Sequence, residues 1–180
     1  MLEFVRIYEG SQCFDEAVAI YESSFPEAER IPVDEIIRGY DGLDCRFEAV
    51  YDDGMLSCIV FTVSDGSLLF LYYLATRADL RSKGIGGRVL ETVYARGGLP
   101  MALNVELVDP SYEDHETRAR RRDFYLRHGF SDTGRVLVDE QGSFNVLCRG
   151  EFDADRYLRF LNSFGTEDCR YLRSAGSCRK

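Results

Sequence analysis

Residues 68–87 constrain the fold of this chain more than any other stretch. An eight-residue apolar run, L-L-F-L-Y-Y-L-A (68–75), leads into the glycine-rich segment R-S-K-G-I-G-G (81–87). Because the run lacks polar alternation, it predicts a strand that is buried on both faces of a sheet. Apolar residues then recur at helical spacing over 85–93, until Gly97-Gly98. The sequence therefore predicts a strand, a glycine-rich turn and an amphipathic helix in succession.

The glycine-rich turn has the composition of an anion-binding site. The first amides of a helix lack intrahelical partners, and the helix dipole makes that end positive. Glycines let a phosphate approach those amides, while Arg81 and Lys83 add positive charge beside them. The turn matches neither G-x-x-x-x-G-K-[ST] nor G-x-G-x-x-G, because the residues that complete those motifs are absent. We expect a cradle for a phosphate or pyrophosphate, and the alternative is a turn whose cations are only solvated.

The remaining pattern predicts one domain of a single α/β layer fold, in the order β-α-α-β-β-β-α-β-α-β-β. Alternating or apolar runs and turn signals such as D-D-G (52–54) predict the other strands. These lie at 2–8, 46–51, 55–64, 101–107, 135–139 and 143–148. Helical patterns occupy 15–23, the segment from Pro32 to Asp41-Gly42, 117–127 and 154–164. A polar, frayed tail is expected to follow.

Composition excludes several classes of function. The net charge of −9 argues against general nucleic-acid binding. The longest apolar run has eight residues, far fewer than the roughly 20 that span a bilayer, so no membrane association is expected. Six cysteines without a C-x-x-C pair predict no metal site, and Cys58 and Cys148 are interpreted as buried hydrophobic residues. The start of the chain lacks the pattern of a signal peptide, so we expect a cytoplasmic protein with reduced thiols.

Two motifs in this frame resemble those of the GNAT (GCN5-related N-acetyltransferase) superfamily. R-x-x-G-x-G (81–86), after a strand that ends in L-A-T, is similar to the family's motif A. F-Y-L-R-H-G-F (124–130) resembles its F-Y-x-x-x-G-F signature. The order of elements also matches across 2–148. The chain is thereby identified as resembling uncharacterised bacterial members of the family.

The resemblance implies the acyl-CoA N-acyltransferase fold. This fold has a mixed, mostly antiparallel central sheet that is splayed between its fourth and fifth strands, here 68–75 and 101–107, and is flanked by helices. Residues 1–150 would form the acetyltransferase domain, and residues 151–180 a C-terminal helical extension and tail of that domain. The family frequently forms homodimers, and 151–180 is a candidate contact.

The resemblance also implies acetyl-CoA as co-substrate, with no metal. By analogy, backbone groups of Leu74, Ala75 and Thr76 pair with the pantetheine arm. The pyrophosphate is expected at the turn and helix start, formed by Arg81, Ser82, Lys83, Gly84, Ile85, Gly86 and Gly87.

Three residues are candidates for the chemistry of acetyl transfer. Tyr125 aligns with the family tyrosine whose hydroxyl points at the coenzyme sulfur, so it is the expected general acid, and the alternative is that its ring only packs on the sheet. Glu106 lies on the polar side of an alternating strand and is a candidate base that acts through water. Its alternative is a solvated or salt-bridged carboxylate. Tyr73 either anchors such a water or packs.

The acceptor is expected to be a primary amine on a small molecule. Transfer to a lysine or N-terminal amine of a protein is one alternative, and a catalytically silent sensor that binds CoA is another. Acidic residues within 23–35 and in the loop 109–116 either draw in a cationic amine or are ordinary helix-start and surface charges.

Overall fold

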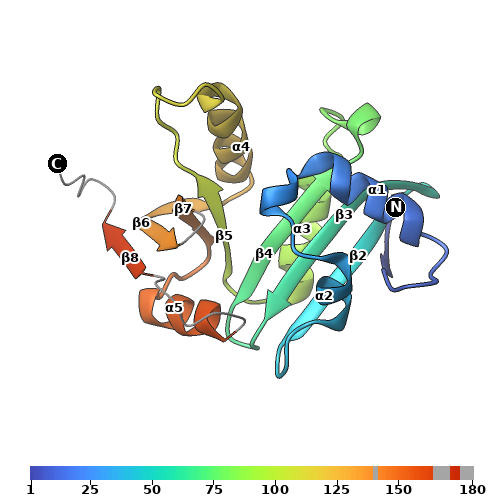
Figure 1. The fold of residues 1–180 in the computed structure, drawn as a ribbon, viewed down its shortest axis with the longest axis horizontal. Coiled ribbons are helices and arrows are strands. Elements are labelled where there is room, and N and C mark those ends of the chain that lie inside the picture. Colours follow the sequence, from blue (N-terminus) through green and yellow to red (C-terminus); the bar gives the residue numbers. More distant parts are fainter. Residues whose placement is uncertain (140–141, 164–170, 175–180) are drawn as a thin grey trace. The chain divides into compact units, whose positions relative to one another are not determined.

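The computed structural model describes residues 1–139, 142–163 and 171–174 (Figure 1). The chain packs as two compact units, Met1–Gly98 and Leu99–Lys180. Both combine antiparallel strands with helices, and the predicted α/β fold with a mostly antiparallel sheet is confirmed. The predicted splay between the fourth and fifth strands concerns the placement of one unit relative to the other and stays a prediction, as does a domain boundary at residue 150.

The first unit is built on four antiparallel strands. They are β1 (Leu2–Arg6), β2 (Asp44–Asp52), β3 (Met55–Ser64) and β4 (Leu69–Thr76), paired in chain order. The predicted D-D-G turn joins β2 to β3, with Asp53 at φ 49° and Gly54 at φ 79°. Two successive positive φ angles match the right-handed twist of a hairpin, which explains the aspartate and glycine there.

Three helices cover this sheet on its two faces. Figure 1 shows α1 (Phe14–Ser24) and α2 (Val33–Arg38) on one face and α3 (Ile85–Gly97) on the other. Short 3-10 turns, Glu27–Glu29 and Ala78–Leu80, follow α1 and precede α3. The bounds agree with the predicted helices to within a few residues.

Apolar packing differs on the two sides of the sheet. Under α1, the rings of Tyr21 and Tyr73 are 5.0 Å apart between centroids in an edge-to-face arrangement. Such aromatic pairs contribute about 0.5–1.5 kcal/mol beyond their buried area. On the other side, α3 buries the stripe that its spacing predicted, which consists of Ile85, Val89, Leu90 and Val93. Cys58 is fully buried on β3, and burial raises the pKa of its thiol to about 12.

The second unit has its own four antiparallel strands. Their spatial order is β5 (Met101–Glu106), β7 (Gly142–Arg149), β6 (Ser131–Asp139) and β8 (Tyr171–Ser174). Helix α4 (His115–Arg127) contacts β5. Helix α5 (Ala154–Asn162) buries the side chains of Tyr157, Phe160 and Leu161, and the Tyr157 hydroxyl donates a hydrogen bond to Asn104 Oδ1 at 2.5 Å.

The predicted order of elements is confirmed, with one correction near the C-terminus. Residues 171–174 were expected in a polar tail, but they form β8, which pairs with β6 from Arg135 to Val138. A four-residue strand carries little periodic signal in the sequence. Its partner strand lies more than 30 residues away, so residues 171–174 are a strand because they pair with β6 and not because of their local sequence. The rest of the predicted tail, 164–170 and 175–180, lies outside the described residues. Among the residues that are described, no helix has the length and apolar character to cross a membrane.

Candidate functional site

The glycine-rich turn 81–87 has a backbone that favours glycine at position 84, directly before α3. Gly84, the N-cap of α3, has φ 78° and ψ 1°, which is the left-handed region. A Cβ at Gly84 would meet no atom within 4 Å, so the backbone conformation, and not crowding, selects glycine there. Ser82 is also left-handed, at φ 63°. The turn therefore folds tightly around two left-handed residues.

The start of α3 presents amide groups without acceptors inside the helix. Its first helical hydrogen bond runs from the Arg88 N–H to the Gly84 carbonyl at 3.2 Å. The amides of residues 85–87 precede that bond and, by helix geometry, have no intrahelical partner. Two of these three residues are glycines, and the first turn contains no acidic residue. The helix dipole and these amides together favour an anion.

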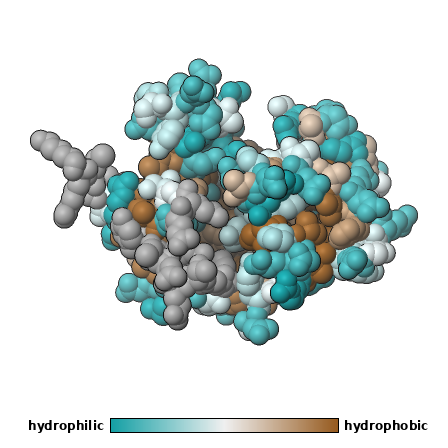
Figure 2. Space-filling model, viewed as in Figure 1, coloured by the Kyte–Doolittle hydropathy of each residue, from teal (hydrophilic) through white to brown (hydrophobic). Residues whose placement is uncertain are grey.

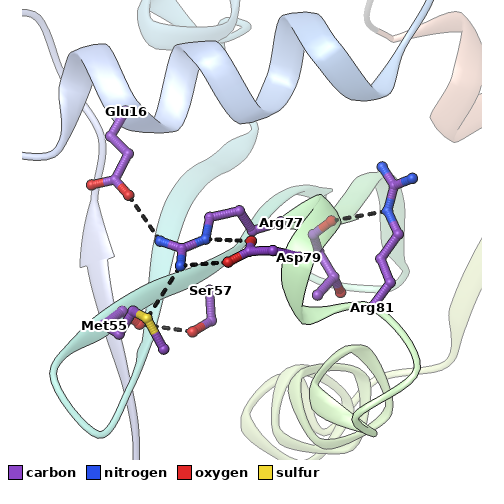
Figure 3. A network of polar contacts seen from close by, with 7 residues as sticks. Glu16, Met55, Ser57, Arg77, Asp79 and Arg81 are labelled. Carbon is purple, nitrogen blue, oxygen red and sulfur yellow. Dashed lines mark hydrogen bonds and ion pairs between the residues drawn. The ribbon is translucent and has the colours of Figure 1, made fainter.

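The two predicted cations of the turn lie on the surface. Arg81 and Lys83 are both exposed. Figure 3 shows the Arg81 side chain folding back toward the end of β4, where its Nε donates to the Thr76 carbonyl at 3.4 Å. Both cations thus lie exposed on the turn before α3, and their contact with a phosphate stays a prediction.

The strand segment predicted to hold the pantetheine arm runs directly into this turn. Residues 74–76 pair with Val60, Ile59 and Cys58 of β3. Just before them the register shifts, because Phe61 pairs with Tyr73 while Thr62 pairs with Leu71. Tyr72 is therefore the extra residue of a β-bulge, which bends the strand locally. All ten predicted coenzyme residues lie on one continuous path, residues 74–87, within the first unit.

Tyr73 both packs and forms hydrogen bonds. Its hydroxyl donates to the Glu29 carbonyl at 2.7 Å and accepts from the Ile31 N–H at 3.1 Å. The Tyr21 hydroxyl donates to the Ile31 carbonyl at 3.0 Å. Burial raises the pKa of both phenols above their usual value. The two tyrosines therefore hold the segment between α1 and α2, a role that the sequence did not indicate.

In the second unit, the F-Y-x-x-x-G-F motif forms the end of α4. The Tyr125 carbonyl accepts hydrogen bonds from the N–H groups of His128 and Phe130, and Gly129 takes φ 82° to make that turn. The half-buried Tyr125 ring lies edge-on to the buried Phe130, with centroids 5.7 Å apart. The glycine and the second phenylalanine thus fix the position of the tyrosine at the last turn of the helix.

Glu106 lies half-buried at the end of β5 and is paired with an arginine of α4. Arg121 Nη1 lies 2.6 Å from Glu106 Oε1. The strand alternation that predicted this position is confirmed over 103–106, where Leu103 and Val105 are buried while Asn104 and Glu106 are half-exposed. It is wrong at Ala102, which is buried. The salt-bridged form of the carboxylate is therefore present, and its role as a base stays a prediction.

The other arginines of the run 118–122 also contact groups of their own unit. Arg118 pairs with Asp114 at 2.8 Å, and Arg122 pairs with Asp132 at 3.0 Å. Arg120 donates to a backbone carbonyl of its own helix. The visible face of α4 is hydrophilic (Figure 2). Arg118, Arg120, Arg121 and Arg122 are thus all engaged within their own unit.

A family model confirms the resemblance that the motifs suggested. The model, described as an acetyltransferase (GNAT) domain, matches residues 44–132. This span contains both R-x-x-G-x-G and F-Y-x-x-x-G-F, and therefore the turn and the helix end described above. The chain is a member of the GNAT superfamily. A search of curated proteins finds no match.

Solved structures of GNAT proteins share the fold of this GNAT member at low sequence identity. A protein from Bacteroides thetaiotaomicron, described as a GNAT-family acetyltransferase, is 22% identical with a TM-score of 0.68, over 88% of this chain and 93% of its own. An aminoglycoside 6′-N-acetyltransferase complexed with coenzyme A is 15% identical with a TM-score of 0.60, over 84% and 99%. The ribosomal-protein-S18-alanine N-acetyltransferase from Escherichia coli is 14% identical with a TM-score of 0.58, over 83% and 93%. These likenesses concern the fold alone.

Proposed function

We propose that this GNAT protein transfers the acetyl group of acetyl-CoA to a primary amine of a small molecule, by direct attack in a ternary complex. The observation that carries the proposal is the start of α3. Gly84 opens the helix in a left-handed conformation, the amides of residues 85–87 have no acceptor inside the helix, and the exposed Arg81 and Lys83 flank them. In a GNAT chain, this arrangement suits the pyrophosphate of the coenzyme.

The residues that would hold the coenzyme are those of the path 74–87. Backbone groups of Leu74, Ala75 and Thr76 are proposed for the pantetheine arm, and residues 81–87 for the pyrophosphate. When bound, acetyl-CoA supplies an acetyl group activated as a thioester. In the net reaction the amine nitrogen bonds to the acetyl carbon, the carbon–sulfur bond breaks, and the amine's proton ends on the sulfur.

Tyr125 and Glu106 are proposed to handle the protons. A tyrosine hydroxyl carries an O–H donor, so Tyr125 is proposed to donate to the departing thiolate. Glu106 is proposed to accept the amine's proton through a water molecule, with its carboxylate oriented by Arg121. A backbone N–H near Leu74 is the proposed donor to the thioester carbonyl.

Calorimetry with acetyl-CoA, and with desulfo-CoA as a control, tests the coenzyme assignment directly. We expect saturable binding of both in the micromolar range, and we expect Gly86→Glu to abolish it because a side chain and a negative charge would meet the pyrophosphate. If the folded wild-type protein does not bind, or if Gly86→Glu binds with unchanged affinity, the glycine turn is only a turn and the proposal fails.

Thiol release from acetyl-CoA in the presence of different acceptors separates the functions that remain. Release with small amines supports the proposal. Release only with peptides, through a lysine or an N-terminal amine, would replace it with a protein acetyltransferase. Binding of the coenzyme with no release under any condition would favour a CoA-binding sensor. Cytoplasmic location and a homodimer stay predictions.

A further inference from the structure

Arg77, the first residue after β4, makes polar contacts with α1, with β3 and with the 3-10 turn Ala78–Leu80. Its Nε and Nη2 hydrogen-bond to the two carboxylate oxygens of Asp79 at 2.8 and 3.0 Å. Its Nη1 donates to Glu16 of α1 at 3.3 Å, and its Nη2 lies 3.2 Å from the sulfur of Met55 at the start of β3. Figure 3 shows the guanidinium at the centre of this network.

The backbone of Arg77 is held as firmly as its side chain. Its N–H donates to the Ser57 carbonyl at 3.0 Å. Ser57 is itself the extra residue of a β-bulge, because Val50 pairs with Cys58 while Tyr51 pairs with Leu56. The Arg77 carbonyl accepts from the Leu80 N–H at 2.9 Å, which starts the 3-10 turn before the glycines. The path of the chain from β4 to Arg81 is thus set at this residue.

The contacts also control where a negative charge lies. Asp79 is two residues from Arg81 and four from Lys83, the cations assigned to the pyrophosphate. The Arg77 guanidinium, which binds both oxygens of Asp79, lowers the pKa of that carboxyl below its usual value. The Arg77 guanidinium thus holds the Asp79 carboxylate and balances part of its negative charge, while that charge also acts on Lys83.

We propose that Arg77 is a positioning residue for coenzyme binding: by joining Glu16, Ser57 and Asp79 it holds the turn 77–84 in the conformation that the pyrophosphate requires. This inference rests on the proposed function, since it assigns a role toward the same turn. It concerns residues outside the R-x-x-G-x-G motif, and Arg77 acts without itself touching the ligand.

Binding of desulfo-CoA, measured by calorimetry, tests the role. Arg77→Met removes the side-chain contacts that hold the turn, so the turn must become ordered when the coenzyme binds. We expect the Kd to rise about tenfold, because this corresponds to the entropic cost of fixing the backbone of roughly one residue. Arg77→Lys should weaken binding similarly, because an ammonium group cannot reproduce the hydrogen bonds of the guanidinium to both Asp79 carboxylate oxygens and to Glu16. Full wild-type affinity in Arg77→Lys would mean that only the charge matters, and the positioning role would be overturned.

Asp79→Asn distinguishes positioning from charge by the sign of the effect. If Asp79 serves only as a negative charge near the phosphates, removing that charge should tighten binding. If it anchors Arg77, the loss of the charge-assisted pair should loosen the turn and weaken binding, which is the expected result. Tighter or unchanged binding would contradict the inference.

Arg46→Met is the matched control. Arg46 forms a similar pair with an aspartate two residues away, Asp44, at 2.7 Å, and it lies at the opposite end of the β2–β3–β4 ladder from Thr76. The Kd of Arg46→Met for desulfo-CoA should equal that of the wild type. A tenfold rise in this Kd would mean that the Arg77 effect is only a general loss of positive charge.

The outcomes for the two proposals are distinguishable. If the wild-type protein fails to bind, the proposed function fails. If the wild type binds and Arg77→Met, Arg77→Lys and Asp79→Asn all bind with the same Kd, only the positioning role fails. Circular dichroism and thermal melting confirm that each variant is folded before its Kd is interpreted.

Discussion

Replacing Tyr73 by phenylalanine is expected to destabilise the first unit by removing one hydroxyl. The phenyl ring keeps its contacts with Tyr21 and with Phe25, whose centroid is 4.7 Å away, so no cavity the size of a side chain is created. What disappears includes the hydrogen bond donated to the Glu29 carbonyl and the one accepted from the Ile31 N–H. Both backbone partners belong to the segment that links α1 to α2.

The magnitude follows from how well water replaces the lost hydroxyl. An intramolecular hydrogen bond contributes about 1 kcal/mol net, and more when a buried partner is left without one. Glu29 is exposed and Ile31 is half-buried. In the variant, water therefore reaches the Glu29 carbonyl more easily than the Ile31 N–H. We expect a loss of about 1.5 kcal/mol in the free energy of unfolding, which for a chain of this size lowers the Tm by roughly 3–6 °C.

Urea unfolding followed by circular dichroism measures this loss, with Tyr8→Phe as the control because Tyr8 is 57% exposed. Proteolysis within 25–32 should also become faster in Tyr73→Phe, since that segment loses its attachment. Tyr21→Phe removes the hydrogen bond to the Ile31 carbonyl, and its effect should not add fully to that of Tyr73→Phe because both act on one residue. If Tyr73→Phe is as stable as the Tyr8→Phe control, the two hydrogen bonds do not contribute as argued.

Three further predictions follow from the site and its surroundings. Ser82→Gly should raise the free energy of unfolding by about 0.5 kcal/mol in urea titration, because glycine relieves the left-handed backbone at φ 63°; a loss of stability would contradict this. Tyr125→Phe should lower turnover far more than it changes the Kd for acetyl-CoA, and full retention of turnover in a thiol-release assay would remove Tyr125 as the acid. Stability should fall as the pH rises above the ordinary tyrosine pKa of about 10, because the unfolded chain then releases a proton that Tyr73, with its raised pKa, keeps when folded. Above that pH, the Tm should fall less steeply with pH in Tyr73→Phe than in the wild type. Identical slopes of Tm against pH would argue against a raised pKa of Tyr73.

Local patterns in the sequence were sufficient to predict most elements and the glycine-rich turn before α3. Apolar periodicity identified the α3 stripe of Ile85, Val89, Leu90 and Val93, because burial of one helical face repeats every three to four residues. The glycines of 81–87 marked the turn before α3, and the structure shows Gly84 there in the left-handed region, which glycine adopts without steric cost. These signals lie within a few residues of the feature that they predict, so no knowledge of distant contacts was needed, and the two GNAT motifs consist of such signals.

The tertiary structure alone decided which partners the polar side chains take. Tyr73 reaches Glu29 and Ile31 across more than 40 residues of sequence, Arg77 reaches Glu16 across 61, and the β6–β8 pairing brings in a segment expected to be a tail. The local sequence pattern is the same whether or not such partners exist. This holds for a tyrosine within an apolar strand, for an arginine that follows such a strand, and for a four-residue segment near a C-terminus. Their roles depend on which backbone groups the fold brings within about 3 Å, and that is set by packing of the whole unit.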